Sequence, residues 1–378
     1  MGDDGNRKLS WRARFVQWRN GLLQPPAFLR WAARFPLTRP LARRRTSDLF
    51  DLVTGFVHTQ IVTACLEVGL LDPMRAKPAS LAELSAASGL DEEAALRLVR
   101  GAVALGLVES VGDDLYALGE LGAALVSNSG ITSMVQHHRI LYDDLRDPVS
   151  LLKDRQSPTR LSQYWAYAQA GAPDDLAADA VGDYSALMAA SQSFICDEVL
   201  DAYPLSRHLH LLDIGGGEGR FAQAALSRAP NLRATVFDLP AVAERAKNRL
   251  ANSDLQSRFD AVGGSFFADE LPRGCDLISL VRILHDHDDD KVLHLLRRIR
   301  EAVDSKARLL IAEPLAATPG AERAGDAYFG FYLLAMRSGR PRTEAELSSL
   351  LSQAGFRLDA RPRTATPLLV RVLIARPV

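Results

Sequence analysis

The chain has 378 residues and a formal net charge of −1, and its composition, 47% hydrophobic and 24% charged, is that of an ordinary globular protein of two or three domains. Its three cysteines, Cys65, Cys196 and Cys275, show no CxxC spacing, which favours a reducing compartment and argues against a disulfide framework or a zinc site. No apolar run reaches the ~18 residues that span a bilayer and the N-terminus lacks an apolar signal core, so we expect a cytoplasmic protein.

Residues 1–45 form a basic, aromatic-rich arm. Eleven Lys or Arg and three Asp among residues 1–50 give this end a charge of +8, and the rest of the chain carries −9. Trp11, Phe15, Trp18 and Trp31 are interleaved with the basic residues. Such a segment can lie on an anionic membrane surface, bind nucleic acid, or pack on a partner subunit as a partly ordered arm, and nucleic acid is the least favoured of the three.

Residues 46–130 have the pattern of a winged helix. Pro36 and Pro40 are expected to break the arm, and residues 46–48 can cap a helix that begins near Leu49. That helix is largely apolar, so we expect it to be buried. Two short helices, over 80–88 and 93–105, and a hairpin of 108–111 with 115–118 then complete a helix-turn-helix with a wing.

The second helix of this winged helix is acidic at its start. Asp91, Glu92 and Glu93 stand there against Arg97 and Arg100, and DNA phosphates would repel that balance. We therefore expect an interaction or dimerisation element and no nucleic-acid partner.

Residues 131–205 are predicted to be mostly helical and to link the two halves of the chain. Tyr184 and Met188 lie four residues apart in an apolar stretch of this segment. Core packing is the default for such a pair, and lining of a substrate pocket is the alternative, because the first strand of the next domain follows closely.

A glycine-rich turn opens the last domain, residues 206–378. An apolar strand passes through Asp213 into Gly215, Gly216, Gly217 and Gly219, and a helix follows. Arg220 stands where a dinucleotide fold would place its third glycine. A carboxylate before Gly-x-Gly-x-Gly suits a ligand with a cationic amino group and no phosphate, such as S-adenosylmethionine (SAM); the alternative is a tight turn without a ligand.

Strands and helices alternate after this turn, as a doubly wound α/β sheet requires. The second strand ends in Asp238, which is placed to hydrogen-bond two ribose hydroxyls. The last two strands can close the sheet as an antiparallel hairpin. The predicted strands are 209–214, 232–237, 258–262, 276–281, 307–312, 356–361 and 368–375, with helices over 290–303 and 343–354.

The densest cluster of titratable groups, residues 282–290, follows the fourth of these strands. His285 can be a general base, or the His-Asp-His run can bind a divalent metal ion. We favour the base and expect no metal, because no further His/Cys cluster completes a site. Asp288, Asp289 and Asp290 are interpreted as caps of the next helix. Glu313 ends the neighbouring strand and can orient the imidazole, or it is an exposed strand-end acid.

Together these residues resemble the SAM-dependent O-methyltransferase family that includes caffeic-acid, flavonoid and acetylserotonin enzymes. The matching segments are 213–219, 237–240, 264–267, 284–286, Glu313 and 342–347. The resemblance implies a seven-stranded Rossmann-like methyltransferase domain and a winged helix that forms a homodimer. It implies catalysis by His285, Asp286 and Glu313; cofactor binding by Asp213, Gly215, Gly217, Gly219, Asp238, Leu239, Ser265, Phe266 and Arg282; and substrate binding by Tyr184, Met188, Tyr332 and Met336.

Four positions depart from the family pattern. His287 replaces a tryptophan that packs on the adenine, and Ser265 replaces an aspartate there. Pro341 replaces a second catalytic glutamate, and Met336 replaces an asparagine that contacts the substrate. The loss of polar groups around the acceptor implies an apolar, non-phenolic substrate.

Residues 35–45, 49–53 and 55–57 resemble more narrowly the bacterial hydroxyneurosporene (demethylspheroidene) O-methyltransferases. Those enzymes methylate the tertiary 1-hydroxyl of acyclic carotenoids, so the resemblance implies a carotenoid substrate. A polyene dissolves in membranes, which would give the basic arm a role at the inner or photosynthetic membrane. The alternatives are methylation of a polyketide or other aromatic hydroxyl and a non-catalytic SAM-binding regulator.

Overall fold

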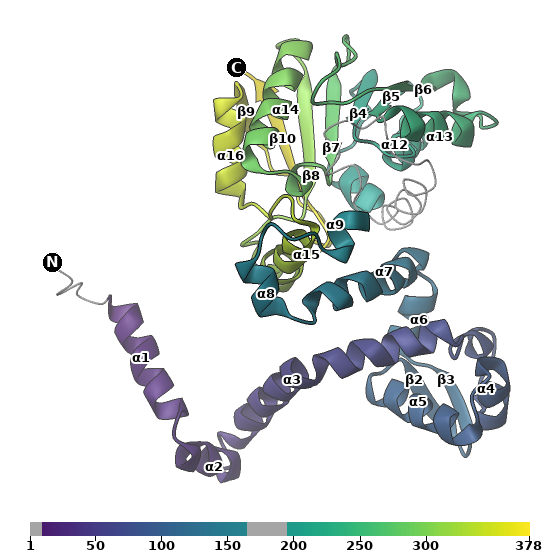
Figure 1. Cartoon of the computed structure of the whole chain (residues 1–378), viewed down its shortest axis with the longest axis vertical. Coiled ribbons are helices and arrows are strands. Elements are labelled where there is room, and N and C mark those ends of the chain that lie inside the picture. Colours follow the sequence, from purple (N-terminus) through teal and green to yellow (C-terminus); the bar gives the residue numbers. More distant parts are fainter. Residues whose placement is uncertain (1–9, 165–194) are drawn as a thin grey trace. The chain divides into compact units, whose positions relative to one another are not determined.

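The computed structural model describes residues 10–164 and 195–378 (Figure 1). The chain divides into two compact units, Met1–Ala123 and Ala124–Val378.

The arm and the first unit begin with three helices: α1 (Trp11–Leu23), α2 (Pro26–Arg34) and α3 (Arg39–Glu67). The predicted break at Pro40 and the predicted start near Leu49 are wrong, because α3 is continuous from Arg39. Pro40 lies in the first turn, where its fixed φ suits a helix and its missing N–H is not needed. Thr46 caps nothing; its hydroxyl donates to the carbonyl of Ala42 inside the helix at 3.0 Å.

Burial of the apolar side chains of α3 was also expected, and for most of the helix this is wrong. Phe50, Leu52 and Phe56 are exposed, and the buried residues of α3 are Thr63 and Cys65 in its last turns. Ile61 packs there on Gly101 of α5 (Glu92–Ala104). By length and composition α3 could also cross a membrane, contrary to the expectation that no apolar run has that length. Within the first unit, a long apolar face of α3 is therefore uncovered.

The remainder of the first unit is the predicted winged helix. A capping box between Ser80 and Glu83 starts α4 (Leu81–Ser88), and Asp91 caps α5 by accepting from the N–H of Ala94 at 2.8 Å. The hairpin of β2 (Val108–Gly112) and β3 (Leu115–Leu118) is confirmed. The pattern missed β1 (Ala79–Ser80), which pairs with β3, and the 3-10 turn η1 (Asp72–Arg75). Helix α6 (Glu120–Val126) follows the wing.

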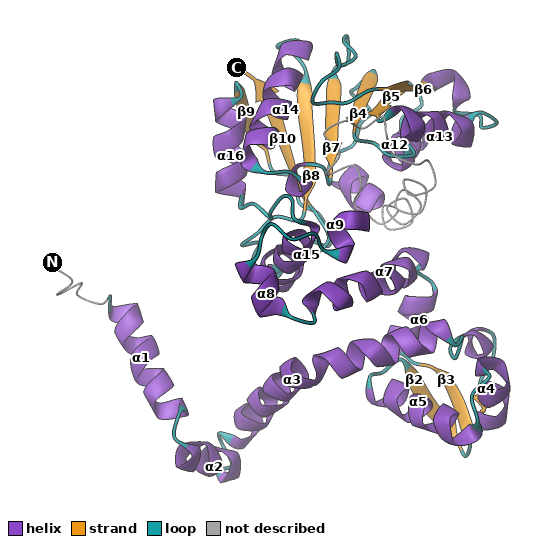
Figure 2. Cartoon of the chain, viewed as in Figure 1, coloured by secondary structure: helices purple, strands orange, loops and turns teal. Residues whose placement is uncertain are grey.

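Helices open the second unit: α7 (Ser129–Leu145), α8 (Pro148–Lys153), α9 (Arg160–Tyr164) and the helical residues 195–202. A seven-stranded sheet follows, in the order β6-β5-β4-β7-β8-β10-β9 (Figure 2). Strands β4 to β8 are parallel, and β10 is antiparallel to both neighbours, so the predicted sheet and closing hairpin are confirmed. The strands are β4 (His210–Ile214), β5 (Arg233–Asp238), β6 (Phe259–Gly263), β7 (Leu277–Val281), β8 (Arg308–Glu313), β9 (Phe356–Ala360) and β10 (Arg371–Pro377).

Both faces of this sheet are covered by apolar side chains. Because successive strand residues point to opposite faces, Leu211 packs with Phe221 and its neighbours, whereas Leu212 packs with Leu295 and its neighbours. Ligands of such sheets bind at the carboxyl ends of the strands. The covering and connecting elements are α12 (Arg220–Arg228), α13 (Pro240–Leu250), η3 (Gln256–Arg258), η4 (Leu284–Asp286), α14 (Asp289–Ala302), the π-helical η5 (Arg323–Tyr328), α15 (Phe329–Met336) and α16 (Glu344–Gln353).

Candidate functional site

The glycine turn between β4 and α12 wraps around the end of Asp213. Gly215, Gly217 and Gly219 have positive φ angles of 65°, 58° and 74°, which favour glycine. A Cβ on Gly216 would lie 2.5 Å from Oδ2 of Asp213, whereas a Cβ on Gly217 would meet nothing within 4 Å. The turn therefore closes tightly on the carboxylate and leaves room on its other side.

Asp213 is buried with half of its hydrogen-bonding capacity unused. Its Oδ1 accepts from the hydroxyl of Ser279 on the neighbouring strand at 2.5 Å, and its Oδ2 has no partner among the described residues. Burial raises the pKa of Asp213 to about 7. An unpaired buried carboxylate oxygen is costly, so this atom fits a ligand that brings a positive charge or a donor.

Asp238 binds the same turn from the end of β5. Its Oδ2 accepts from the N–H of Gly217 at 2.7 Å, and its Oδ1 accepts from the N–H of Leu239 at 2.7 Å. Burial raises the pKa of Asp238 to about 6, although both backbone donors favour the charged form. The expected contacts of Asp238 with a ribose and of Leu239 with the cofactor remain predictions.

Three aromatic rings cluster beside the turn. Phe266 lies 3.6 Å from the Cβ position of Gly215, and its ring centroid is 4.7 Å from that of Phe267. His287 is edge-on to both rings, at 5.7 and 5.0 Å. Burial lowers the pKa of His287 to about 4, so this imidazole is neutral near pH 7. Ser265 accepts through its hydroxyl from the N–H of Phe267 at 3.3 Å.

Arg282 follows β7 in a strained backbone conformation, with a φ of 58°. Its N–H donates to the carbonyl of Ala312 at 2.8 Å, and its guanidinium lies 5.8 Å from the ring centroid of Phe329. Strain of this kind concentrates at functional sites. Its expected cofactor contact remains a prediction.

His285 is held between two carboxylates in the 3-10 turn η4. It is 5% exposed; its Nδ1 is paired with Oε2 of Glu313, and its Nε2 lies 3.0 Å from Oδ1 of Asp286. Burial alone would lower the pKa of His285, but the charges of Asp286 and Glu313 outweigh it and raise the pKa to about 9. The three residues predicted to act together are therefore in contact.

Glu313 also fixes the turn that carries the histidine. Its Oε1 accepts from the N–H groups of Ile283 at 3.0 Å and Leu284 at 2.7 Å. Because β7 and β8 are adjacent, with Val281 opposite Ala312, Glu313 arrives directly beside the turn. Glu313 is buried, so the alternative of an exposed strand-end acid is wrong.

The predicted place of the three aspartates at the start of α14 is confirmed, because Asp288 is its N-cap and Asp289 and Asp290 lie in its first turn, but the predicted capping bond is absent. Asp288 occupies the N-cap position of α14, but its side chain makes no capping bond and accepts instead from the N–H of Gly339 at 3.2 Å. Asp289 forms ion pairs with Arg340 at 2.9 Å and Arg342 at 2.8 Å. The carboxylates of Asp288 and Asp289 are therefore bonded to residues 339–342, a loop about fifty positions later in the chain.

Helix α15 carries the described part of the predicted substrate site. The ring centroid of Phe329 is 5.6 Å from that of His285, and the hydroxyl of Tyr332 is 2.9 Å from Nε2 of His137 on α7. Met336 is 0% exposed and packs in an apolar cluster, so its contact with a substrate stays a prediction. The predicted pocket residues Tyr184 and Met188 lie outside the described residues.

Several contacts of the site were not predicted. His138 pairs with the hydroxyl of Tyr328 at 2.8 Å, as His137 does with Tyr332, and burial lowers the pKa of both histidines. Arg342 is buried against η4. Adjacent histidines and an Arg-Thr dipeptide are visible in the sequence, but nothing in the sequence pairs them with segments this far away.

Comparison with known proteins defines the class. Residues 163–357 match the O-methyltransferase domain, and residues 50–128 match the O-methyltransferase dimerisation domain. The chain belongs to the O-methyltransferase family, and the predicted family and fold are confirmed. The dimerisation domain supports a homodimer and includes the exposed apolar part of α3 from Phe50 onward.

Individual relatives show which members of the family the chain resembles. The chain is 40% identical to the demethylspheroidene O-methyltransferase of Cereibacter sphaeroides, over 86% of this chain and 85% of that protein. It is 37% identical to the enzyme of the same name from Rhodobacter capsulatus, over 90% and 85%. Among solved structures, human N-acetylserotonin methyltransferase in complex with SAM has a TM-score of 0.72 and 26% identity, over 88% of this chain and 97% of that one. The expected enzyme class and cofactor are thereby confirmed at the level of the family.

Proposed function

We propose that this protein transfers a methyl group from SAM to a hydroxyl of an acyclic carotenoid, with His285 as the general base. The observation that carries the proposal is the buried His285–Glu313 pair at the carboxyl ends of β7 and β8, beside β4, where Oδ2 of Asp213 has no partner among the described residues. The proposed cofactor turn and the oriented imidazole thus follow neighbouring strands, β4 and β7, at the ligand-binding edge of one sheet.

The residues of the glycine turn fit SAM. Oδ2 of Asp213 is free to accept from a cationic amino group, the bare backbone at Gly217 permits close approach, and Phe266 offers a ring beside Gly215. Bound SAM supplies an electrophilic methyl group on a sulfonium. Holding two reactants in line accounts for up to ~7–11 kcal/mol of a barrier, so positioning by these residues is the larger share of the expected rate.

His285 must be uncharged before it can take a proton. Its raised pKa, about 9, makes it a stronger base than an ordinary histidine, at the cost of a smaller deprotonated fraction at pH 7. Glu313 holds Nδ1, which leaves Nε2 as the atom that receives the proton, and Asp286 lies 3.0 Å from Nε2 to stabilise the imidazolium. Base assistance of this kind contributes about 10²–10⁴-fold, and a tertiary alcohol needs it more than a phenol does.

The substrate class rests on the relatives and on the walls of the site. Both demethylspheroidene enzymes cover more than four fifths of the chain. The described residues beside His285 include three aromatic rings: Tyr328 lies against Phe329 and Tyr332, with ring centroids 5.0 and 5.7 Å away. Such surfaces suit a polyene.

Labelled SAM tests this proposal with a panel of hydroxylated acyclic carotenoids and phenols. Transfer of label to the carotenoid hydroxyl supports it. Transfer to phenols alone would identify an aromatic acceptor instead, and binding of SAM without any transfer would identify a non-catalytic regulator.

We further propose that the arm, residues 1–45, places the enzyme on an anionic membrane surface. Trp11, Phe15, Trp18 and Leu22 recur every three or four residues and so share one face of α1. Trp11 is 81% exposed and Trp18 is 62% exposed. Residues 10–47 contain nine arginines and no acidic residue, which suits an anionic lipid surface.

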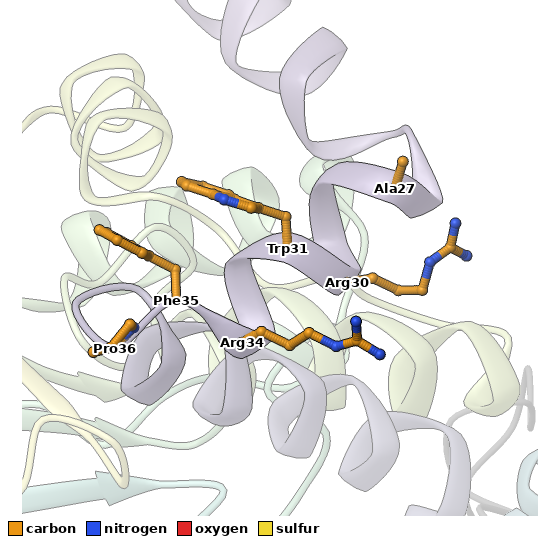
Figure 3. A pocket seen from close by; sticks show the side chains of 6 residues that line it. All are labelled: Ala27, Arg30, Trp31, Arg34, Phe35 and Pro36. Carbon is orange, nitrogen blue, oxygen red and sulfur yellow. The ribbon is translucent and has the colours of Figure 1, made fainter.

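Helix α2 repeats this division of aromatic and basic side chains (Figure 3). The rings of Trp31 and Phe35 are stacked 5.1 Å apart, and Figure 3 shows them pointing away from Arg30 and Arg34. These residues line a shallow groove together with Ala27 and Pro36. Aromatic rings at the headgroup level with arginines among the phosphates would be the expected arrangement.

Co-sedimentation with vesicles of phosphatidylglycerol and phosphatidylcholine tests the arm. We expect binding that needs phosphatidylglycerol, weakens with salt and falls in a Trp11→Ala/Trp18→Ala variant. Leu209→Ala, which removes a side chain 68% exposed outside the arm, is the matched control and should bind as the wild type does. If the Trp11→Ala/Trp18→Ala variant binds vesicles as the wild type does but no longer forms a dimer, the arm packs on a partner subunit instead.

A further inference from the structure

One loop, residues 338–342, forms hydrogen bonds with the backbone of the turn that carries His285. The carbonyl of His285 accepts from the N–H of Arg340 at 2.9 Å, and that of Asp286 accepts from the hydroxyl of Ser338 at 2.7 Å. The carbonyls of Leu284 and His287 both accept from the guanidinium of Arg342. Four consecutive carbonyls of the turn are therefore bonded to this loop.

Arg342 spans the turn with a single side chain. It is 3% exposed; Nη1 donates to the carbonyl of Leu284 and Nη2 to that of His287, each at 2.6 Å, and Nε donates to Asp289 at 2.8 Å. A planar guanidinium has five donors in a fixed fork, so it can bridge two carbonyls where a lysine cannot. Its two carbonyl partners lie on either side of the His285–Asp286 pair.

Gly339 allows the loop to lie directly on the turn. Its φ is 76°, and a Cβ there would lie 2.5 Å from the carbonyl carbon of Asp286 and would also collide with the carbonyl oxygen of His285. Any side chain at this position must therefore displace the backbone that carries the histidine.

The turn needs this support. Element η4 is three residues long, and its closing bond, from the N–H of His287 to the carbonyl of Leu284, is 3.4 Å long. Short 3-10 turns have poor hydrogen-bond geometry and leave carbonyls for other donors. Without the loop, Glu313 would be the main polar group that fixes the orientation of His285.

We infer that Arg342, seated by Gly339, is a positioning residue that orients His285 for the acceptor and His287 against the aromatic rings of the cofactor side. The inference rests on the proposed role of His285. The same loop follows α15, so the helix that carries Phe329 and Tyr332 connects directly to the support of the base. A change in this loop alters the angle of the imidazole without removing any group that touches a reactant.

Arg342→Lys tests this role, since it keeps the charge and loses the bridge. We expect kcat to fall by about tenfold or more, in the range of lost acid–base assistance, with little change in the KM for SAM. Guanidinium should partly restore an Arg342→Ala variant. Gly339→Ala should lower kcat in the same way, because its Cβ would displace the same turn. This variant tests the inference if the Arg342 variants do not fold.

Arg258→Lys is the matched control. Arg258 also bonds three carbonyls, those of Leu226, Ala229 and Leu232, but at the amino end of β6, away from the ligand-binding edge. We expect this variant to lose stability and keep the kcat of the wild type. If Arg342→Lys lowers kcat no more than Arg258→Lys does, the positioning role is wrong.

An NMR titration of the His285 ring, with S-adenosylhomocysteine and no acceptor, separates this inference from the proposed function. Arg342→Lys should lower the pKa of His285, because its contacts with Asp286 and Glu313 loosen, and Arg258→Lys should not. An unchanged His285 titration in Arg342→Lys contradicts the inference. A shifted titration in an enzyme whose turnover does not depend on His285 supports the positioning and contradicts the proposed base.

Discussion

Nδ1 of His285 is paired with Oε2 of Glu313, and both side chains are buried at the carboxyl ends of adjacent strands. The same carboxylate accepts from two backbone N–H groups of the turn that carries the histidine. Glu313 therefore sets both the orientation of the ring and the place of its backbone, and the next predictions depend on this pair.

His285→Gln should remove the base while leaving the cofactor turn intact. We expect turnover to fall at least about tenfold, with SAM affinity nearly unchanged. Methyl transfer and calorimetric SAM binding measure the two effects. His210→Gln, which changes a histidine at the start of β4 that bonds Thr235, is the control. Equal turnover in the wild type and His285→Gln would remove His285 from the mechanism.

The rate should rise with pH until His285 is deprotonated. The proton-free form is the base, and the pKa of His285 is about 9, so kcat should increase through the neutral range and level off above about pH 9. Asp286 and Glu313 are the charged groups that raise it, and His287 is neutral in this range. Glu313→Gln should move the profile to lower pH and reduce its plateau. A rate independent of pH between 6 and 10 would contradict the assignment.

Asp213→Asn should separate cofactor binding from stability. Oδ2 of Asp213 is buried without a partner among the described residues, so removal of the charge should leave the unfolding temperature unchanged or higher. SAM should bind more weakly by about 1.5–3 kcal/mol, the range for a hydrogen bond to a charged group. Calorimetry and thermal unfolding measure these effects. Unaltered SAM affinity would show that the turn does not hold the cofactor through this carboxylate.

His287 should act as an aromatic ring and not as a charge. It is neutral and edge-on to Phe266 and Phe267, so His287→Ala should weaken SAM binding by about 0.5–1.5 kcal/mol, whereas His287→Trp should retain it. His294→Ala, on a ring stacked 6.4 Å from Phe267, is the control. A SAM affinity that follows the protonation of His287 near neutral pH would contradict this role.

The sequence predicted most of the sheet and the glycine turn after β4, because local pattern decides them. Alternating apolar segments specify the strands, and the positive φ angles at Gly215, Gly217 and Gly219 demand glycine whatever the tertiary context. The contact of His285 with Glu313 was also predictable, since adjacent parallel strands end at the same edge.

Other features depend on distant segments and could not be predicted. The exposure of the apolar side chains of α3 could not be predicted, because an apolar pattern does not distinguish residues packed in a core from residues at a surface. The burial of Arg342 depends on the carbonyls of Leu284 and His287, more than fifty positions earlier in the chain. The sequence predicted that the side chain of Asp288 caps a helix. In the structure this side chain instead accepts a hydrogen bond from the N–H of Gly339, which lies in a distant loop.

The most direct test of the central claim is methyl transfer from labelled SAM to an acyclic carotenoid with a tertiary 1-hydroxyl, presented in phosphatidylglycerol-containing vesicles, by the wild type and His285→Gln side by side. The account predicts a labelled methyl ether at that hydroxyl with the wild type and at least about tenfold less with His285→Gln. Label in phenols alone, or equal transfer by the two proteins, would contradict it.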